Sequence, residues 1–122
     1  MTSNVAAAYR DNKIMTATPA ELTLMLYEGI IKFCNMAISA NEKKDIAKAH
    51  SNIIKAESII TELKSTLDFN YPVSKELNSI YEYLYERLTE ANLKKDNAIL
   101  EEVLYFAREL RDTWKEAMKL AQ

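Results

Sequence analysis

Apolar residues recur at helical spacing along most of the chain. The clearest start signal is the sequence TPAE at residues 18–21. Thr18 and Glu21 have the spacing of a capping box, in which each side chain accepts a hydrogen bond from the other residue's backbone amide. Pro19 suits the first helical position, because its missing N–H has no helical partner there. We therefore predict a first helix over residues 19–40.

This first helix carries apolar residues on two sides. One stripe, at spacings of three and four, consists of Leu22, Met25, Leu26, Gly29, Phe33 and Met36. A second stripe, two residues out of phase, consists of Leu24, Tyr27, Ile31 and Ile38. Two residues correspond to about 200° around a helix, so the stripes are expected to face nearly opposite ways. Such a helix needs one cover from its own fold and another from a tail or a second protein.

Three more helices follow from the same periodicity, over residues 45–67, 74–94 and 98–120. We expect Asp45 and Ser74 to cap the first two of these. The seam of residues 45–67 keeps heptad spacing and consists of Ile46, Ala49, Ile53, Ala56, Ile60, Leu63 and Leu67. Such spacing is typical of coiled coils and antiparallel bundles.

Similar helix lengths and short connections predict an all-α fold, an antiparallel up-down four-helix bundle over residues 18–122. The single Gly and two Pro agree with long helices. Residues 1–17 have no sustained helical period and are expected to form an extended or short-helical, flexible tail. Its apolar points are Tyr9, Ile14 and Met15, which could fold over the bundle as a lid.

Composition adds little chemistry to this fold. The net charge is −2 without a basic block, which argues against nucleic-acid binding. The sequence shows no apolar run of 18 residues and no recognisable signal peptide. Cys34 is the only cysteine, so no internal disulfide can form. We therefore expect a cytoplasmic protein that does not span a membrane. His50 is the only histidine, which excludes the usual di-iron set, and neither a metal nor a cofactor is expected.

An enzymatic alternative would use Arg87, Arg108 and Arg111 to bind an anionic substrate. Salt bridges with neighbouring acidic residues on solvated helix faces explain these arginines equally well, so we expect no enzyme. Mid-helix Gly29 has two explanations, close packing between helices or room for a ligand side chain.

The apolar residues exceed the needs of four seams, and tyrosine and tryptophan suit contact surfaces. They predict a groove for amphipathic segments of another chain. The candidate groove residues are Leu24, Tyr27, Ile31, Ile54, Ile59, Tyr81, Tyr85, Leu104 and Trp114. Any of them could instead belong to a thick core. A further alternative is a self-assembling structural bundle, in which the extra stripes are buried against a second copy.

The chain resembles the flagellar secretion chaperone FliS family over nearly its whole length. The resemblance rests on Tyr9, on TATPAELTLMLYEG (16–29), NIIKAESIITEL (52–63), TLD (66–68), IYEYLYERLTEANLKKD (80–96) and LEEVLYFARELRDTWKEA (100–117). Arg10 departs from the glutamine expected in many relatives, which leaves the tail as the weakest part of the match.

The resemblance implies a cytoplasmic, non-enzymatic chaperone. Members of the family bind the disordered C-terminal segment of flagellin, prevent its premature polymerisation and assist its delivery to the flagellar type III export gate. Some relatives also bind the flagellar anti-sigma factor. A disordered client that orders on binding needs a large contact area, which agrees with surplus apolar surface.

Overall fold

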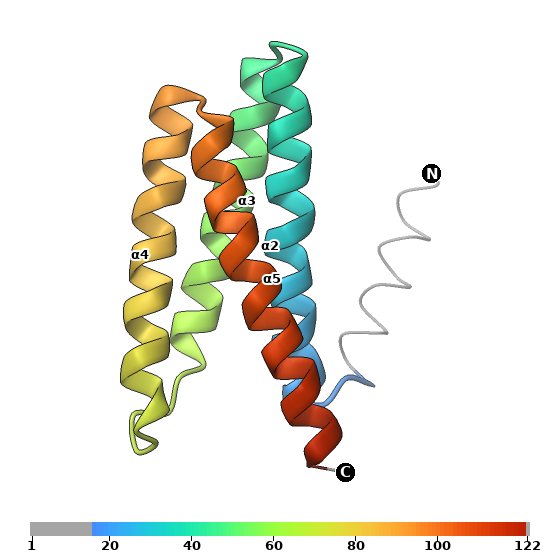
Figure 1. The fold of residues 1–122 in the computed structure, drawn as a ribbon, viewed down its shortest axis with the longest axis vertical. Coiled ribbons are helices and arrows are strands. Elements are labelled where there is room, and N and C mark those ends of the chain that lie inside the picture. Colours follow the sequence, from blue (N-terminus) through green and yellow to red (C-terminus); the bar gives the residue numbers. More distant parts are fainter. Residues whose placement is uncertain (1–15, 122) are drawn as a thin grey trace.

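The computed structural model describes residues 16–121, and within that range it has four α-helices. They are α2 (Pro19–Glu42), α3 (Ile46–Ser65), α4 (Val73–Lys94) and α5 (Asn97–Leu120). Consecutive helices run antiparallel (Figure 1). The predicted all-α four-helix bundle is confirmed.

Each helix packs on two neighbours. α2 lies against α3 and α5, and α4 also lies against α3 and α5, so α2 and α4 are diagonal partners. Figure 1 shows the α2–α3 and α4–α5 turns at one end of the bundle and the α3–α4 loop at the other. In the same view α5 begins beside α4 and diverges from it towards the C-terminal end.

The helix starts follow from local hydrogen bonds. At α2 the capping box is complete, because the Glu21 amide donates to Thr18 Oγ1 at 3.1 Å and the Thr18 amide donates to Glu21 Oε1 at 3.2 Å. At α3 the side chain of Asp45 accepts from the Lys48 amide at 3.1 Å, as its N-cap position predicts.

The expected cap of α4 is wrong. Pro72 occupies the N-cap position without a side-chain hydrogen bond, and Ser74 is already inside the helix. Ser74 is buried and its hydroxyl donates to the Asp68 carbonyl at 2.5 Å. The hydroxyl therefore stabilises the preceding loop, and Pro72 begins the helix because its fixed φ is already helical.

The core lies along the centre of the bundle, and each helix contributes residues at spacings of three and four. Its largest fully buried side chains are Tyr27, Tyr81, Ile30, Ile53, Ile60, Leu63, Leu84, Leu88, Leu100, Leu104, Val103 and Cys34. Ile46, expected in the seam of α3, is exposed instead. It is the first residue of its helix, at the end of the bundle, where the neighbouring helices do not cover it.

α2 also corrects one expectation about membranes. It is long and apolar enough to cross a bilayer by length and composition, although the sequence pattern suggested that no segment was. A core helix of a water-exposed bundle passes the same test, and α2 supplies Tyr27, Ile30 and Cys34 to the core. Fully buried residues make up 22% of its apolar window, and the other apolar side chains of α2 are partly buried.

Candidate binding surface

The two apolar stripes of α2 flank its buried seam. The seam is Tyr27, Ile30, Cys34 and Ala37, at steps of three, four and three. Tyr27 also belongs to the second stripe, and the other three residues lie angularly between the stripes. The stripes therefore form the two edges of the buried face.

Each edge of α2 meets one neighbouring helix. On the first edge, Gly29 adjoins Ile59 of α3. On the second, Tyr27 packs edge-on against Trp114 of α5, with ring centroids 6.5 Å apart. Partial burial of Leu24 and Ile31 follows, because neighbouring helices cover these edges incompletely.

Three of the predicted groove residues, Tyr27, Tyr81 and Leu104, lie in the core of this structure. Tyr27 and Tyr81 are each 2% exposed, and their hydroxyls share a hydrogen bond of 2.7 Å across the diagonal of the bundle. Burial raises the pKa of both phenols above the ordinary value, so both are neutral at physiological pH. None of the three presents an exposed surface in this structure.

Gly29 permits close packing between α2 and α3. A Cβ atom built there would lie 2.8 Å from Ile59 Cδ1, closer than real contacts allow. Of the two explanations for this glycine, the contact supports helix packing, and the space is filled by the chain's own Ile59. Ile59, one of the predicted groove residues, therefore packs against α2 within the bundle.

Trp114 joins the C-terminal part of α5 to the first turns of α2. Its indole Nε1 donates to the Ala20 carbonyl at 2.8 Å, while its ring meets the ring of Tyr27. The side chain is partly buried and packs against the core.

Ile54 and Tyr85 are the exposed members of the predicted set, at 41% and 39%. Both lie along the α3–α4 junction, where three cross-helix pairs fix an antiparallel register. Those pairs are His50–Asn92, Glu57–Thr89 and Lys64–Glu82. Leu24 and Ile31 lie instead on the edge of α2 that meets α5, so this pair is separate from them.

The sequence prediction omitted several exposed apolar residues. Phe69 and Tyr71 lie in the α3–α4 loop, Val73 and Leu93 on α4, and Tyr105 on α5. The sequence could have indicated the exposure of the loop residues, because two aromatic residues in a short connection next to Pro72 are too far from the helix seams to be buried in the core. The expected lid residues Tyr9, Ile14 and Met15 lie outside the described residues.

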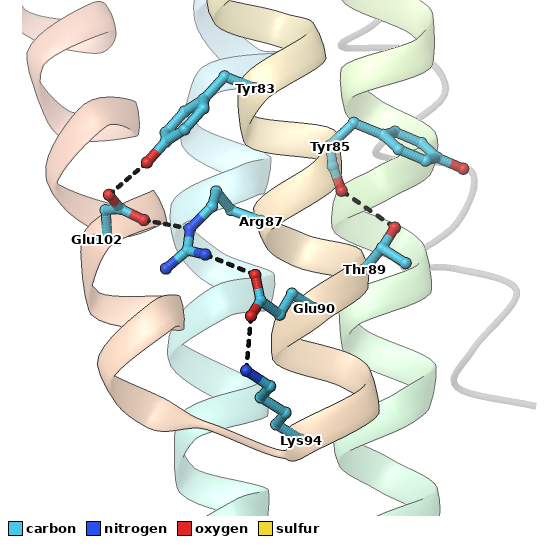
Figure 2. A network of polar contacts seen from close by, with 7 residues as sticks. All are labelled: Tyr83, Tyr85, Arg87, Thr89, Glu90, Lys94 and Glu102. Carbon is cyan, nitrogen blue, oxygen red and sulfur yellow. Dashed lines mark hydrogen bonds and ion pairs between the residues drawn. The ribbon is translucent and has the colours of Figure 1, made fainter.

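A polar network joins α4 to the N-terminal half of α5 (Figure 2). Arg87 donates from Nε to Glu102 and from Nη1 to Glu90, both at 2.6 Å, and Tyr83 donates to Glu102 at 2.7 Å. The Tyr83 hydroxyl and Arg87 together hold the pKa of Glu102 below its ordinary value. Tyr85 points away from this network in Figure 2.

These contacts leave few side chains that could take part in catalysis or bind a metal. Arg87, the centre of the enzymatic alternative, is already paired with two carboxylates. Burial raises the pKa of the Cys34 thiol to about 12, which makes a thiolate nucleophile unfavourable. His50 is exposed and bonded to Asn92, and residues 16–121 contain no cluster of three His, Cys, Asp or Glu side chains suited to a metal.

Comparison with known proteins finds one family over nearly the whole chain. The sequence profile of the family described as "Flagellar protein FliS" matches residues 1–121. The flagellar secretion chaperone FliS of Bacillus subtilis (strain 168) is 44% identical over 116 residues, which cover 95% of this chain and 87% of the relative. The protein of the same name from Campylobacter jejuni is 32% identical over 119 residues, covering 95% and 93%. That of Escherichia coli (strain K12) is 28% identical over 111 residues, covering 88% and 82%.

The chain therefore belongs to the FliS family of flagellar proteins. It is a flagellar secretion chaperone and not an enzyme, and its client is a flagellar protein.

Proposed function

We propose that this chaperone binds the disordered C-terminal segment of flagellin in the bacterial cytoplasm. Binding would keep the segment from polymerising and would present the subunit to the flagellar type III export apparatus. Contacts with an export-gate component and with the anti-sigma factor belong to the same proposal as further partners. It is supported by family membership and by one feature of the bundle, a complete core that still leaves large apolar side chains at the surface.

The physical basis is the cost of ordering the client. A disordered segment loses conformational entropy when it becomes helical, and coupled folding of this kind typically buries about 1,000–3,000 Å². Apolar side chains at i, i+3 and i+4 of the client could pack against exposed apolar residues of the bundle. No cofactor takes part, because desolvation of apolar surface supplies the free energy.

We assign the client contacts to predicted groove residues that keep accessible surface in the folded bundle. Leu24 and Ile31 on α2 and Ile54 and Tyr85 along the α3–α4 junction keep accessible apolar surface. Because these pairs lie on different sides of the bundle, a client that contacts both would have to wrap around it. An extended chain with short helices suits that geometry better than one rigid helix.

Calorimetric titration with a peptide from the C-terminus of the host's flagellin tests the proposal. Ile54→Asp should weaken binding at least tenfold without altering stability, because the side chain is 41% exposed. Leu93→Asp is the matched control, since Leu93 is 83% exposed and is not one of the four proposed contact residues. Equal affinities for both variants and the wild type would refute this surface. Absence of peptide binding by the wild type, with a tight dimer on a sizing column, would instead favour self-assembly.

A further inference from the structure

α5 is attached to the bundle unevenly along its length. Its first half supplies the buried residues Ile99, Leu100, Val103, Leu104 and Ala107, and Glu102 ties it to α4. Residues 111–121 contain no buried residue. Within this segment Trp114 alone packs against the core, and the Arg111–Asp112 ion pair joins two residues of the segment itself.

The C-terminal segment also lies away from α4. Figure 1 shows α5 diverging from α4 in this half, so within residues 16–121 α2 is the neighbouring helix that remains. Trp114 provides two contacts with α2, the hydrogen bond to the Ala20 carbonyl and the edge-on contact with Tyr27. Opening this contact would leave the buried residues of α5 in place.

Trp114 covers a defined strip of α2. Ala20 and Tyr27 are seven residues apart, which is about two turns, and Leu24 lies between them on the same face. The indole therefore lies over the strip that carries Leu24, a residue of the proposed client surface. Its departure would uncover apolar surface on α2 that is continuous with Leu24.

We infer that residues 111–121 form a strap that is held on α2 by Trp114 and that yields this strip to an apolar side chain of the client. The inference rests on the proposed function for the identity of the displacing group, while the strap itself is a property of the free chain. A strap that must open before binding makes the client compete with Trp114. The contact then regulates how readily the α2 side of the surface is available.

Hydrogen exchange of the full chain tests the strap without any client. An undocked helical end of 11 residues frays, because short helices are marginal in water, so its amides should exchange faster than those of residues 97–107. Trp114→Phe removes the N–H donor and keeps an aromatic ring. It should speed exchange in residues 111–121 by about two- to tenfold, the loss expected for one hydrogen bond, and leave α3 unchanged.

Tyr105→Phe is the matched control. It removes a polar group from an exposed aromatic residue in the docked half of the same helix. It should leave exchange in residues 111–121 at the wild-type rate. Slow exchange there in the wild type that Trp114→Phe does not change would overturn the strap, and so would equal acceleration by the control.

Tryptophan fluorescence tests displacement by the client and needs no substitution. Trp114 is the only tryptophan, so its emission reports this contact directly. Addition of a tryptophan-free peptide from the flagellin C-terminus should shift the emission to the red and increase quenching by acrylamide, as the indole leaves α2. A blue shift, or no shift although calorimetry shows binding, would overturn the inference. If calorimetry shows no binding, the proposed function fails, and the exchange experiment alone decides the strap.

Discussion

The buried tyrosine pair offers the sharpest test of the core. Tyr27 and Tyr81 are both 2% exposed, and their hydroxyls are 2.7 Å apart. Replacing one tyrosine by phenylalanine removes one hydroxyl and leaves the other buried without its partner. An unsatisfied buried polar group costs about 1–3 kcal/mol, so each single variant should lose about that much free energy of unfolding.

The double variant should be less damaging than the sum of the single ones. Tyr27→Phe with Tyr81→Phe leaves no hydroxyl unpaired, and the ring of Tyr27 keeps its contact with Trp114. A loss of about 0–1 kcal/mol is expected, because removing both partners of a hydrogen bond can be nearly neutral. The coupling free energy between the two positions should therefore exceed about 1 kcal/mol.

Urea unfolding of the four proteins, followed by far-ultraviolet circular dichroism, measures this coupling. Thermal unfolding gives a second reading, since 1 kcal/mol corresponds to about 4 °C for a chain of this length. Single variants within about 0.3 kcal/mol of the wild type, or strictly additive losses, would show that the hydroxyls are not paired in a dry core.

Three further outcomes follow from local contacts. Gly29→Ala should change the free energy of unfolding by less than about 1 kcal/mol in circular dichroism melts, because the gain in helix propensity offsets displacement of the flexible tip of Ile59; a loss above about 2 kcal/mol would mean that the tip cannot move. Thr18→Ala should cost about 0.5–2 kcal/mol by removing the bond to the Glu21 amide, and unchanged urea stability would contradict that cap. Glu102→Gln should make the free energy of unfolding fall less steeply at acid pH. The pKa of Glu102 is lowered in the folded state, so its ionised form stabilises the fold above the unfolded-state pKa near 4.5. This stabilisation is lost as the pH falls through the lower folded-state pKa. Parallel acid unfolding curves for variant and wild type would argue against this linkage.

Periodicity predicted the helices because it reports which residues share a face. The seam of α3 from Ala49 to Leu63 is buried as its heptad spacing indicates. Capping chemistry was equally local, and the Thr18 and Asp45 caps are both present. The expected Ser74 cap is wrong because the helix already begins at Val73, and the Ser74 and Lys75 amides donate to the Tyr71 and Pro72 carbonyls instead.

The candidate surface was harder to predict because periodicity does not say which face points inward. On α2 the core lies between the two predicted stripes, and its centre uses the small side chains of Cys34 and Ala37. A sequence pattern is recognised mainly from large apolar residues, and on α2 these lie at the edges of the buried face, so the pattern predicted the edges and not the centre. Tyrosine suits a contact surface because it has an apolar body and a polar tip, but the hydroxyls of Tyr27 and Tyr81 satisfy each other and both rings lie in the core.

The heat capacity change on binding flagellin tests the central claim most directly, because it measures apolar surface removed from water. Calorimetry of the full chain with the C-terminal segment of the host's flagellin, at several temperatures, gives this quantity. Burial of about 2,000 Å², mostly apolar, predicts one-to-one binding with a negative heat capacity change on the order of 0.3 kcal/mol/K, and more if the client folds. Binding with a heat capacity change near zero, or no binding at all, would contradict the account.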